Sequence, residues 1–136
     1  MRTEQKQKLA QLRHWRVRRK IRGTRERPRM SVRFTNENIY VQFIDDNAGT
    51  TLAAASTTSK SAPDRDKLAA NVASARVIGK LAAEAALASG IKSVVFDRGG
   101  ARYHWSRGKG KDGKPVTVLG KLAALASAAR EAGLKF

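Results

Sequence analysis

The stretch RMSVRFTNENIYVQFIDDNAGTTLAAAS, residues 29–56, decides the fold. Apolar and polar residues alternate through residues 30–35 and again through residues 39–43, and this two-residue period is typical of strands with one buried face. Turns rich in Asn, Asp and Gly separate the runs and lead into a third run, TLAAAS, which is assigned as a strand by its position. The stretch therefore predicts three antiparallel strands joined by short turns.

A long helix is expected after these strands. Ser61 is a suitable N-cap, Pro63 suits the first turn, and Asp64 completes a capping box. Gly90 suits the C′ position that ends a helix, so the sequence predicts a helix between Ser61 and Gly90. The side chains expected on its inner face are mostly small, which lets a helix lie close to a sheet: Leu68, Val72, Ala75, Ile78, Ala82 and Ala85.

One more strand and one more helix complete the predicted body. Residues 91–96, IKSVVF, should run parallel to a neighbouring strand because a β-α-β order requires a crossover. Residues 120–134 form a second alanine-rich helix, closed by Gly133. We predict an α/β (α+β) fold of order β-β-β-α-β-α, in which helices pack on a mixed sheet. A single domain, residues 29–136, suits a chain of this length, with a basic inserted loop at about 105–119.

Positive charge is concentrated at the two ends of the chain, whose net charge is +17. Residues 1–33 contain 13 Lys and Arg against two acidic residues, residues 34–100 contain seven against seven, and residues 101–136 contain eight against two. Clustered positive charge attracts a polyanion and releases its counterions. We infer a nucleic-acid partner; a solvated tail with no fixed partner is the alternative.

Composition excludes several other classes of protein. The chain has no cysteine, which excludes disulfide scaffolds and thiolate metal sites. No apolar run is long enough for a signal peptide or a membrane span, and the basic end lacks the broad apolar face of an interfacial helix. We expect a cytosolic protein without a membrane partner.

Residues 1–28 are predicted to form a basic RNA-binding arm. Leu9, Leu12 and Trp15 are spaced three apart, as on one face of a helix. The many neighbouring like charges make such a helix marginal on its own, so we expect it to become ordered on binding. Gly23 and Pro28 follow it and break the helix.

Two motifs resemble enzyme sites. Residues 108–115, GKGKDGKP, match the phosphate-loop pattern except at the end, where Pro115 replaces the hydroxyl that binds magnesium; a flexible lysine-rich hairpin tip explains them better. The strand order also suits a ribonuclease-H-like nuclease with Asp97 as a metal ligand. The first strand carries no acid, however, and Asp46, which follows Asp45, is interpreted as a turn former. We predict no enzymatic activity, no metal and no cofactor.

The segment VVFDRGG, residues 94–100, is interpreted as a loop-forming element. Asp97 accepts neighbouring N–H groups and holds Arg98, while Gly99 and Gly100 allow positive φ and a close approach of the backbone to a phosphate. A tight turn without a ligand is the alternative. Tyr103, like Trp15, either stacks on unpaired bases or covers the edge of the core, and we favour stacking.

Several blocks of the sequence resemble one family. They are RPRMSV, NIYVQFIDD, GTTLAAAST, VVFDRGG, YH and ALASAAREAGLKF. In this order they closely resemble the bacterial large-subunit ribosomal protein eighteen family, and the resemblance covers nearly the whole chain. It implies a β-α-β core with a basic N-terminal extension, no enzymatic activity and a place in cytoplasmic ribosomes.

The resemblance also implies partners. They are 5S rRNA, the large-subunit rRNA to which 5S rRNA is attached in the central protuberance, and ribosomal protein five. Two segments depart from the family pattern: RFTNENIY, residues 33–40, carries Glu37 and Asn38 where the family has basic residues, and the basic residues 105–119 are inserted before Gly120. The remaining alternative for a binding protein is a general, DNA-compacting one.

The predicted RNA-binding residues offer a positive charge, a ring that can stack or a backbone that can approach a phosphate. They are Arg13, His14, Trp15, Arg16, Arg18, Arg19, Lys20, Arg22, Arg25, Arg27, Arg29, Arg33, Arg98, Gly99, Gly100, Arg102, Tyr103, His104, Arg107 and Lys121.

Overall fold

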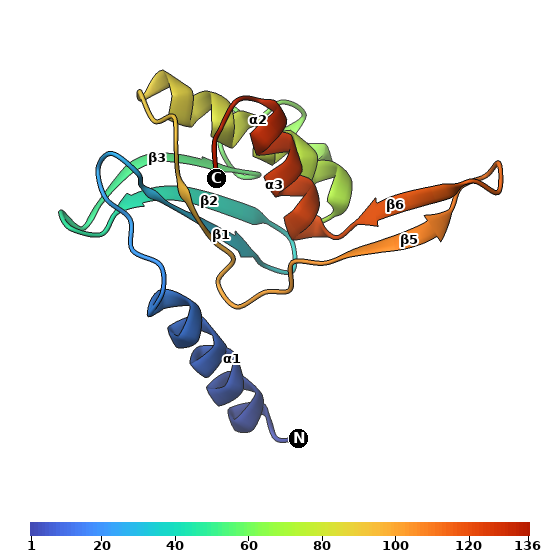
Figure 1. Cartoon of the computed structure of the whole chain (residues 1–136), viewed down its shortest axis with the longest axis horizontal. Helices are drawn as coiled ribbons and strands as arrows, with labels where there is room; N and C mark the ends of the chain where they lie inside the picture. Colours follow the sequence, from blue (N-terminus) through green and yellow to red (C-terminus); the bar gives the residue numbers. More distant parts are fainter.

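The computed structural model describes all 136 residues. Helices α2 and α3 cover one face of a four-stranded sheet, α1 lies below the sheet in Figure 1, and a two-stranded hairpin projects from one end. In chain order the elements are α1 (Thr3–Arg18), β1 (Arg29–Phe34), β2 (Ile39–Asp45), β3 (Thr50–Ser56), the 3-10 turn η1 (Arg65–Lys67), α2 (Val72–Ala88), β4 (Val95–Asp97), β5 (Trp105–Lys109), β6 (Pro115–Leu119) and α3 (Lys121–Glu131). The predicted α+β fold is confirmed, and β5 and β6 form a separate small sheet.

The sheet has the strand order β3-β2-β1-β4. As predicted, β1, β2 and β3 pair antiparallel, and β4 runs parallel to β1. Met30 lies opposite Phe43 and Val32 opposite Val41, and all four side chains are buried. The alternation of apolar residues therefore sets the register, since a slip of one residue would turn these side chains to the other face.

The core lies between this face of the sheet and the two alanine-rich helices. Ile78 and Ala82 of α2 and Leu125 of α3 are fully buried, and burying a large aliphatic side chain contributes about 1.5–3 kcal/mol. A Cβ added at Gly79 would overlap the carbonyl oxygen of Leu125. Small residues thus bring α2 close to α3 as well as to the sheet.

The predicted start of the long helix at Ser61 is wrong. Asp64 has a φ of 48°, a left-handed conformation that no helix interior contains. The helix begins after Asn71, whose side chain accepts a hydrogen bond of 2.8 Å from the backbone N–H of Ser74. The hydroxyl of Ser74 in turn accepts one of 3.0 Å from the N–H of Ala69. This pair of side chains satisfies N–H groups at the helix start and outweighs the weaker signal at residue 61.

The late start of α2 also changes its inner face. Ala75, Ile78 and Ala82 are buried as predicted. Leu68 lies before the helix, and the remaining two predicted positions, Val72 and Ala85, are half-buried.

The predicted helix ends are confirmed. Gly90 follows α2 with a φ of 78°, and Gly133 follows α3 with a φ of 112°; positive φ at C′ favours glycine. None of the helices is both long and apolar enough to cross a membrane.

Residues 108–115 lie at the tip of the β5–β6 hairpin. β5 ends at Lys109 and β6 begins at Pro115, so the segment connects strand to strand. A phosphate loop runs from a buried strand into a helix. The similarity of this segment to a phosphate loop is therefore one of sequence only.

Candidate nucleic-acid interface

The carboxylate of Asp46 attaches the arm to the body, together with a hydrogen bond of 3.3 Å from Nε of Arg27 to the carbonyl of Val94. Its oxygens accept hydrogen bonds of 3.3 Å from both terminal nitrogens of Arg18, at the end of α1, and one of 2.7 Å from the N–H of Gly23. A Cβ at Gly23 would overlap backbone atoms of Arg29 and Ile44, so only glycine fits here. The chain between α1 and β1 is thus packed on the body, and Asp46 holds it there.

The same carboxylate belongs to a buried network of charges. Nε of Arg29 lies 3.0 Å from Oδ2 of Asp46, and one terminal nitrogen of Arg29 lies 2.8 Å from Oδ2 of Asp97. The side chain of Arg29 is 10% exposed and that of Asp97 is fully buried. Arg29 therefore joins the arm to the end of β4, and buried charges of this kind must be paired.

This network determines the ionisation of its members. Burial alone would raise the pKa of Asp46, but hydrogen bonds from Arg29, the Gly23 N–H and Arg18 outweigh it and hold the pKa of Asp46 well below its usual range. Burial likewise opposes the charged form of Arg29, while its two carboxylate partners raise its pKa above the ordinary value. Both groups are charged at neutral pH.

Two predictions for residues of this network need correction. Asp46, predicted to form a turn, is the ion-pair partner just described, while the turn is made by Asp45, which accepts the N–H groups of Asn47 and Ala48 at 3.0 and 3.4 Å. Arg29, predicted to bind RNA, is used inside the protein by its two carboxylates. Strand alternation points Asp45 and Asp46 in opposite directions, and only the second faces Arg29.

The loop after β4 is organised by Asp97. Its Oδ1 accepts a hydrogen bond of 2.8 Å from the N–H of Gly99, as predicted. Arg98 is not held by Asp97: it points to solvent and donates to the carbonyl of Ala101 at 3.0 Å. Gly99 and Gly100 have φ values of 60° and 82°, the positive φ predicted for this glycine pair.

Gly100 brings the loop close to α1. A Cβ at Gly100 would lie 3.2 Å from Cβ of Arg13 and 3.3 Å from the backbone nitrogen of His14. The absence of a side chain at residue 100 therefore serves the packing of helix against loop. Helix α1 and the loop after β4 thus pack together, and Asp97, which organises the loop, is paired with Arg29.

A groove of about 710 Å³ lies where α1, the loop and the free edge of β1 meet. β4 ends opposite Ser31, so beyond this residue the edge of β1 is open. We call this surface the α1 groove, and it is lined by Ala10, Gln11, His14, Ser31, Val32, Arg33, Phe34, Arg98, Gly99 and Ala101. Four of the predicted RNA-binding residues meet here, and none of the lining residues is acidic.

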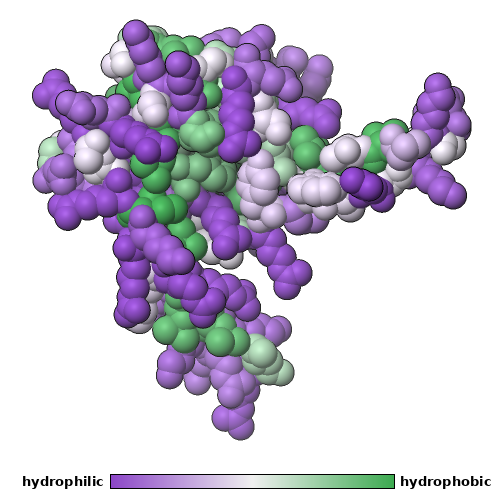
Figure 2. All heavy atoms as spheres, in the orientation of Figure 1, coloured by the Kyte–Doolittle hydropathy of each residue, from purple (hydrophilic) through white to green (hydrophobic).

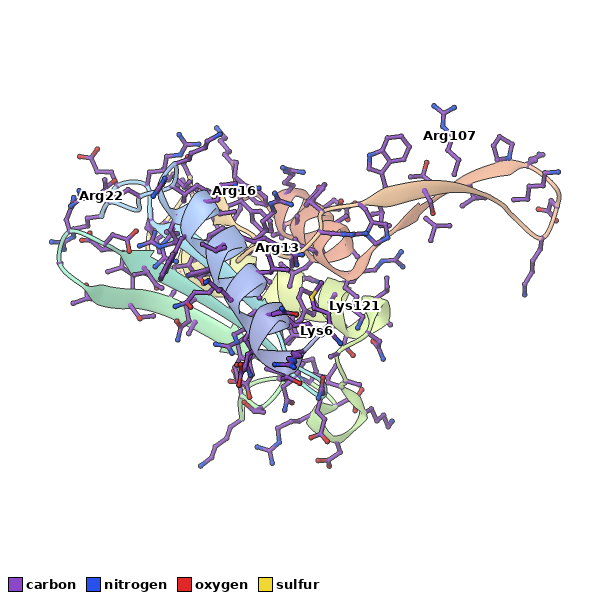
Figure 3. All side chains as sticks on the ribbon, turned by 90° about the horizontal axis from the view of Figure 1, so that it is seen from below. Lys6, Arg13, Arg16, Arg22, Arg107 and Lys121 are labelled. Atoms are coloured by element: carbon purple, nitrogen blue, oxygen red, sulfur yellow. The ribbon has the colours of Figure 1, made fainter.

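Other predicted residues lie elsewhere. Arg13 and Arg16 lie on α1, and Arg22 lies on the segment after it. Lys121 is the first residue of α3, and Arg107 lies on the projecting hairpin (Figure 3). The remaining cations near the arm are exposed: Arg19, Lys20, Arg25 and Arg27. The positive charge thus forms at least two separate surfaces.

Tyr103 covers the edge of the core. Its ring meets Phe96 edge to face, with centroids 6.3 Å apart, and its hydroxyl lies 3.3 Å from a guanidinium nitrogen of Arg130. Phe96 also stacks on Phe136 at 5.2 Å. Tyr103 thus contacts the edge of the core, but it is 39% exposed, and stacking of its ring on RNA stays a prediction. Trp15 is 53% exposed on α1 and remains free to stack.

Helix α1 itself buries no residue. Its apolar side chains include Leu9 and Leu12, which are 40% and 43% exposed, and Figure 2 shows an apolar patch on α1. Most helical stability in proteins comes from burying such a face. The expected ordering of α1 on RNA binding stays a prediction.

The sequence matches the family model for ribosomal L18 of archaea, bacteria, mitochondria and chloroplast over residues 4–109. The large ribosomal subunit protein uL18 of Lactococcus lactis subsp. cremoris is 50% identical over 131 residues, which cover 96% of this chain and 95% of the relative. The proteins of the same name from Lactobacillus delbrueckii subsp. bulgaricus and Petrotoga mobilis are 52% and 45% identical over the same shares.

The residues matched by the family model include every strand of the main sheet, α2 and the loop after β4. The family match ends at residue 109, the last residue of β5. On this match and on the identity to relatives over nearly the whole chain, the protein belongs to the ribosomal L18 family and is a structural, non-enzymatic component of the large ribosomal subunit in the cytoplasm.

Proposed function

We propose that the chain binds 5S rRNA and helps attach it to the large-subunit rRNA in the central protuberance, beside ribosomal protein five. The α1 groove carries this proposal. A basic helix, an open strand edge and a glycine turn meet there on a surface without acidic side chains. Such a surface neutralises phosphates and accommodates a folded RNA, whose shape and backbone are the features that proteins contact most.

The roles within this surface follow from the positions of the residues. Arg13 and Arg16, exposed on α1, neutralise phosphates and supply affinity that weakens with salt. His14, Arg33 and Arg98 line the groove and contact the RNA that enters it. The other exposed predicted residues extend this surface along the arm and around the loop: Trp15, Arg19, Lys20, Arg22, Arg25, Arg27 and Arg102.

The carboxylates support this surface and do no chemistry of their own. Asp97 is bound by the Gly99 N–H and Arg29, and Asp46 by Arg29, Arg18 and the Gly23 N–H. A two-metal nuclease needs carboxylates that are free to bind cations. The network thus supports a positioning role for both residues and argues against the nuclease alternative.

A DNA-compacting protein is the competing function, because duplex DNA offers the same phosphates. The test uses purified full-length chain, fluorescently labelled 5S rRNA and a DNA duplex of equal phosphate number at physiological salt. We expect 5S rRNA to bind at least about 1,000-fold tighter, the lower end of the usual range for specific over non-specific nucleic-acid binding. Equal affinity for the two would overturn the proposal.

A charge-matched pair of variants locates the surface. Arg13→Gln with Arg16→Gln removes two charges from α1, and we expect it to lower the affinity for 5S rRNA about tenfold. The control, Arg76→Gln with Lys80→Gln, removes two exposed charges from α2, on the opposite side of the sheet. Equal losses in the two variants would show that net charge alone drives binding.

A further inference from the structure

The β5–β6 hairpin is an extension that the α1 groove does not use. Its strands pair with each other from Trp105 opposite Leu119 to Lys109 opposite Pro115. It is fastened at its base, where the Gly120 N–H donates to the carbonyl of His104 at 3.0 Å, and from there it projects away from the body (Figure 1). A two-stranded hairpin that contacts the body only at its base is marginal alone, which indicates that a partner completes it.

The two faces of the hairpin differ in chemistry. Alternate residues of one strand share a face, and so do residues opposite each other in an antiparallel pair. Trp105, Arg107 and Lys109 therefore lie together on one side, beside their partners Leu119, Thr117 and Pro115. Val116 and Val118 lie on the other side, opposite Gly108 and Ser106, and a Cβ at Gly108 would lie 3.3 Å from Cγ2 of Val118. The first face thus holds the indole and both cations of the two strands, and the second face carries no charge.

The charge of the hairpin is mostly positive. Residues 105–119 contain four Lys and Arg residues and a single acid, Asp112, which lies in the turn. Trp105 is 56% exposed, and Arg107 points outward, away from the ribbon (Figure 3). An exposed indole in line with two cations, without a neighbouring carboxylate, complements an anionic and aromatic partner, and a polynucleotide is both.

We propose that the face formed by Trp105, Arg107 and Lys109 is a second RNA-binding site that holds an unpaired segment of RNA. The indole stacks on one base, and the two cations neutralise the phosphates that follow. Alternate residues on a strand face are about 7 Å apart, a spacing that matches successive nucleotides of an extended strand. Because bases are exposed for stacking in single strands and not inside duplexes, the site selects unpaired RNA.

This site is independent of the proposed 5S rRNA contact. The α1 groove lies at the arm, whereas the hairpin extends from the start of α3. A protein partner is the alternative, and it would use the apolar face formed by Val116 and Val118. We favour RNA over a protein partner because every charge on the two strands is positive.

The test follows the fluorescence of Trp105. Trp15→Phe in the full-length chain leaves Trp105 as the sole indole, and the probes are an unstructured 12-nucleotide RNA and a 12-base-pair RNA duplex. We expect saturable quenching by the single strand and none by the duplex. Arg107→Gln with Lys109→Gln should weaken the affinity reported by Trp105 and flatten its salt slope by about 1.4 units, because each phosphate contact on a single strand contributes about 0.7.

The control acts on the other face. Val116→Thr with Val118→Thr keeps β-branched residues in β6 and should leave the quenching unchanged. Quenching by duplex as strong as by single strand, or none by either, would overturn the inference. So would a Trp105 emission that responds to a mixture of ribosomal proteins and not to RNA. Anisotropy of labelled 5S rRNA, recorded in parallel, reports the α1 groove, so failure of one site is distinguished from failure of the other.

Discussion

Replacing Asp97 by asparagine tests the network beneath the α1 groove. The substitution keeps the shape of the side chain and removes its charge. The two oxygens of Asp97 now accept the N–H of Gly99 and the guanidinium of Arg29, each at 2.8 Å. An amide offers only one oxygen, so its NH₂ group would face a second donor. Arg29 would keep Asp46 as its partner.

The expected cost follows from the burial of this contact. Removing one partner of a buried ion pair costs about 3–5 kcal/mol, but asparagine retains one hydrogen bond and Arg29 keeps one carboxylate. We therefore expect Asp97→Asn to lower the free energy of unfolding by about 2–4 kcal/mol. The loosened Gly99 turn should also weaken binding of 5S rRNA by about 5- to 30-fold, equal to 1–2 kcal/mol.

Urea unfolding measures the first effect and anisotropy of labelled 5S rRNA the second. Asp45→Asn is the matched control, because Asp45 is also buried but accepts only backbone N–H groups, which an asparagine oxygen accepts equally well. It should change stability by less than about 1 kcal/mol. If the two variants lose the same stability, or if Asp97→Asn loses less than about 0.5 kcal/mol, the charge of Asp97 does not hold the network.

Three further predictions concern acid, packing and the hairpin. The pKa of Asp46 is depressed in the folded state, so its contribution to the free energy of unfolding is complete above about pH 5 and is lost as the pH falls below the ordinary carboxyl pKa near 4. The urea midpoint of the wild-type protein should therefore fall between about pH 6 and pH 2, and more steeply than that of Asp46→Asn. Gly79→Ala should destabilise the protein by about 1–3 kcal/mol in thermal unfolding, because its methyl group meets the Leu125 carbonyl; an unchanged melting temperature would disprove the close contact of α2 and α3. Deleting residues 105–119 should leave the free energy of unfolding within about 1 kcal/mol of wild type, and collapse of the fold would show the hairpin to be structural.

The sheet was predictable because its signal is local. Alternating apolar residues in β1 and β2 and the positive-φ glycines after α2 and α3 each depend on neighbours in sequence. The start of α2 was not predicted correctly, although the signals that set it are also local. Ser61 and Asn71 both suit an N-cap, and Asn71 prevails because Ser74 adds a second hydrogen bond, to Ala69.

The charge network was beyond prediction for a different reason. Arg29 is separated by 17 residues from Asp46 and by 68 from Asp97, and no spacing rule relates such distant positions. A hint lay in the acids themselves, since the chain has only 11 against 28 basic residues. The same lack of long-range information explains why Arg29 was assigned to RNA.

The central claim is that α1 binds RNA through its charges, and truncation tests it most directly. Deleting residues 1–17 removes five Lys and Arg residues and keeps Arg18 and Gly23, which hold Asp46. α1 buries no residue, so the body should stay folded, which urea unfolding checks. The measurement is the slope of log affinity for 5S rRNA against log salt concentration, with and without these residues.

Each phosphate contact contributes somewhat less than one unit to that slope. If α1 makes three to five such contacts, the truncated chain should show a slope about three to four units shallower and a weaker affinity. Equal slopes for the two chains would contradict the account, because they would show α1 to be a solvated helix and would place the whole RNA-binding surface on the body.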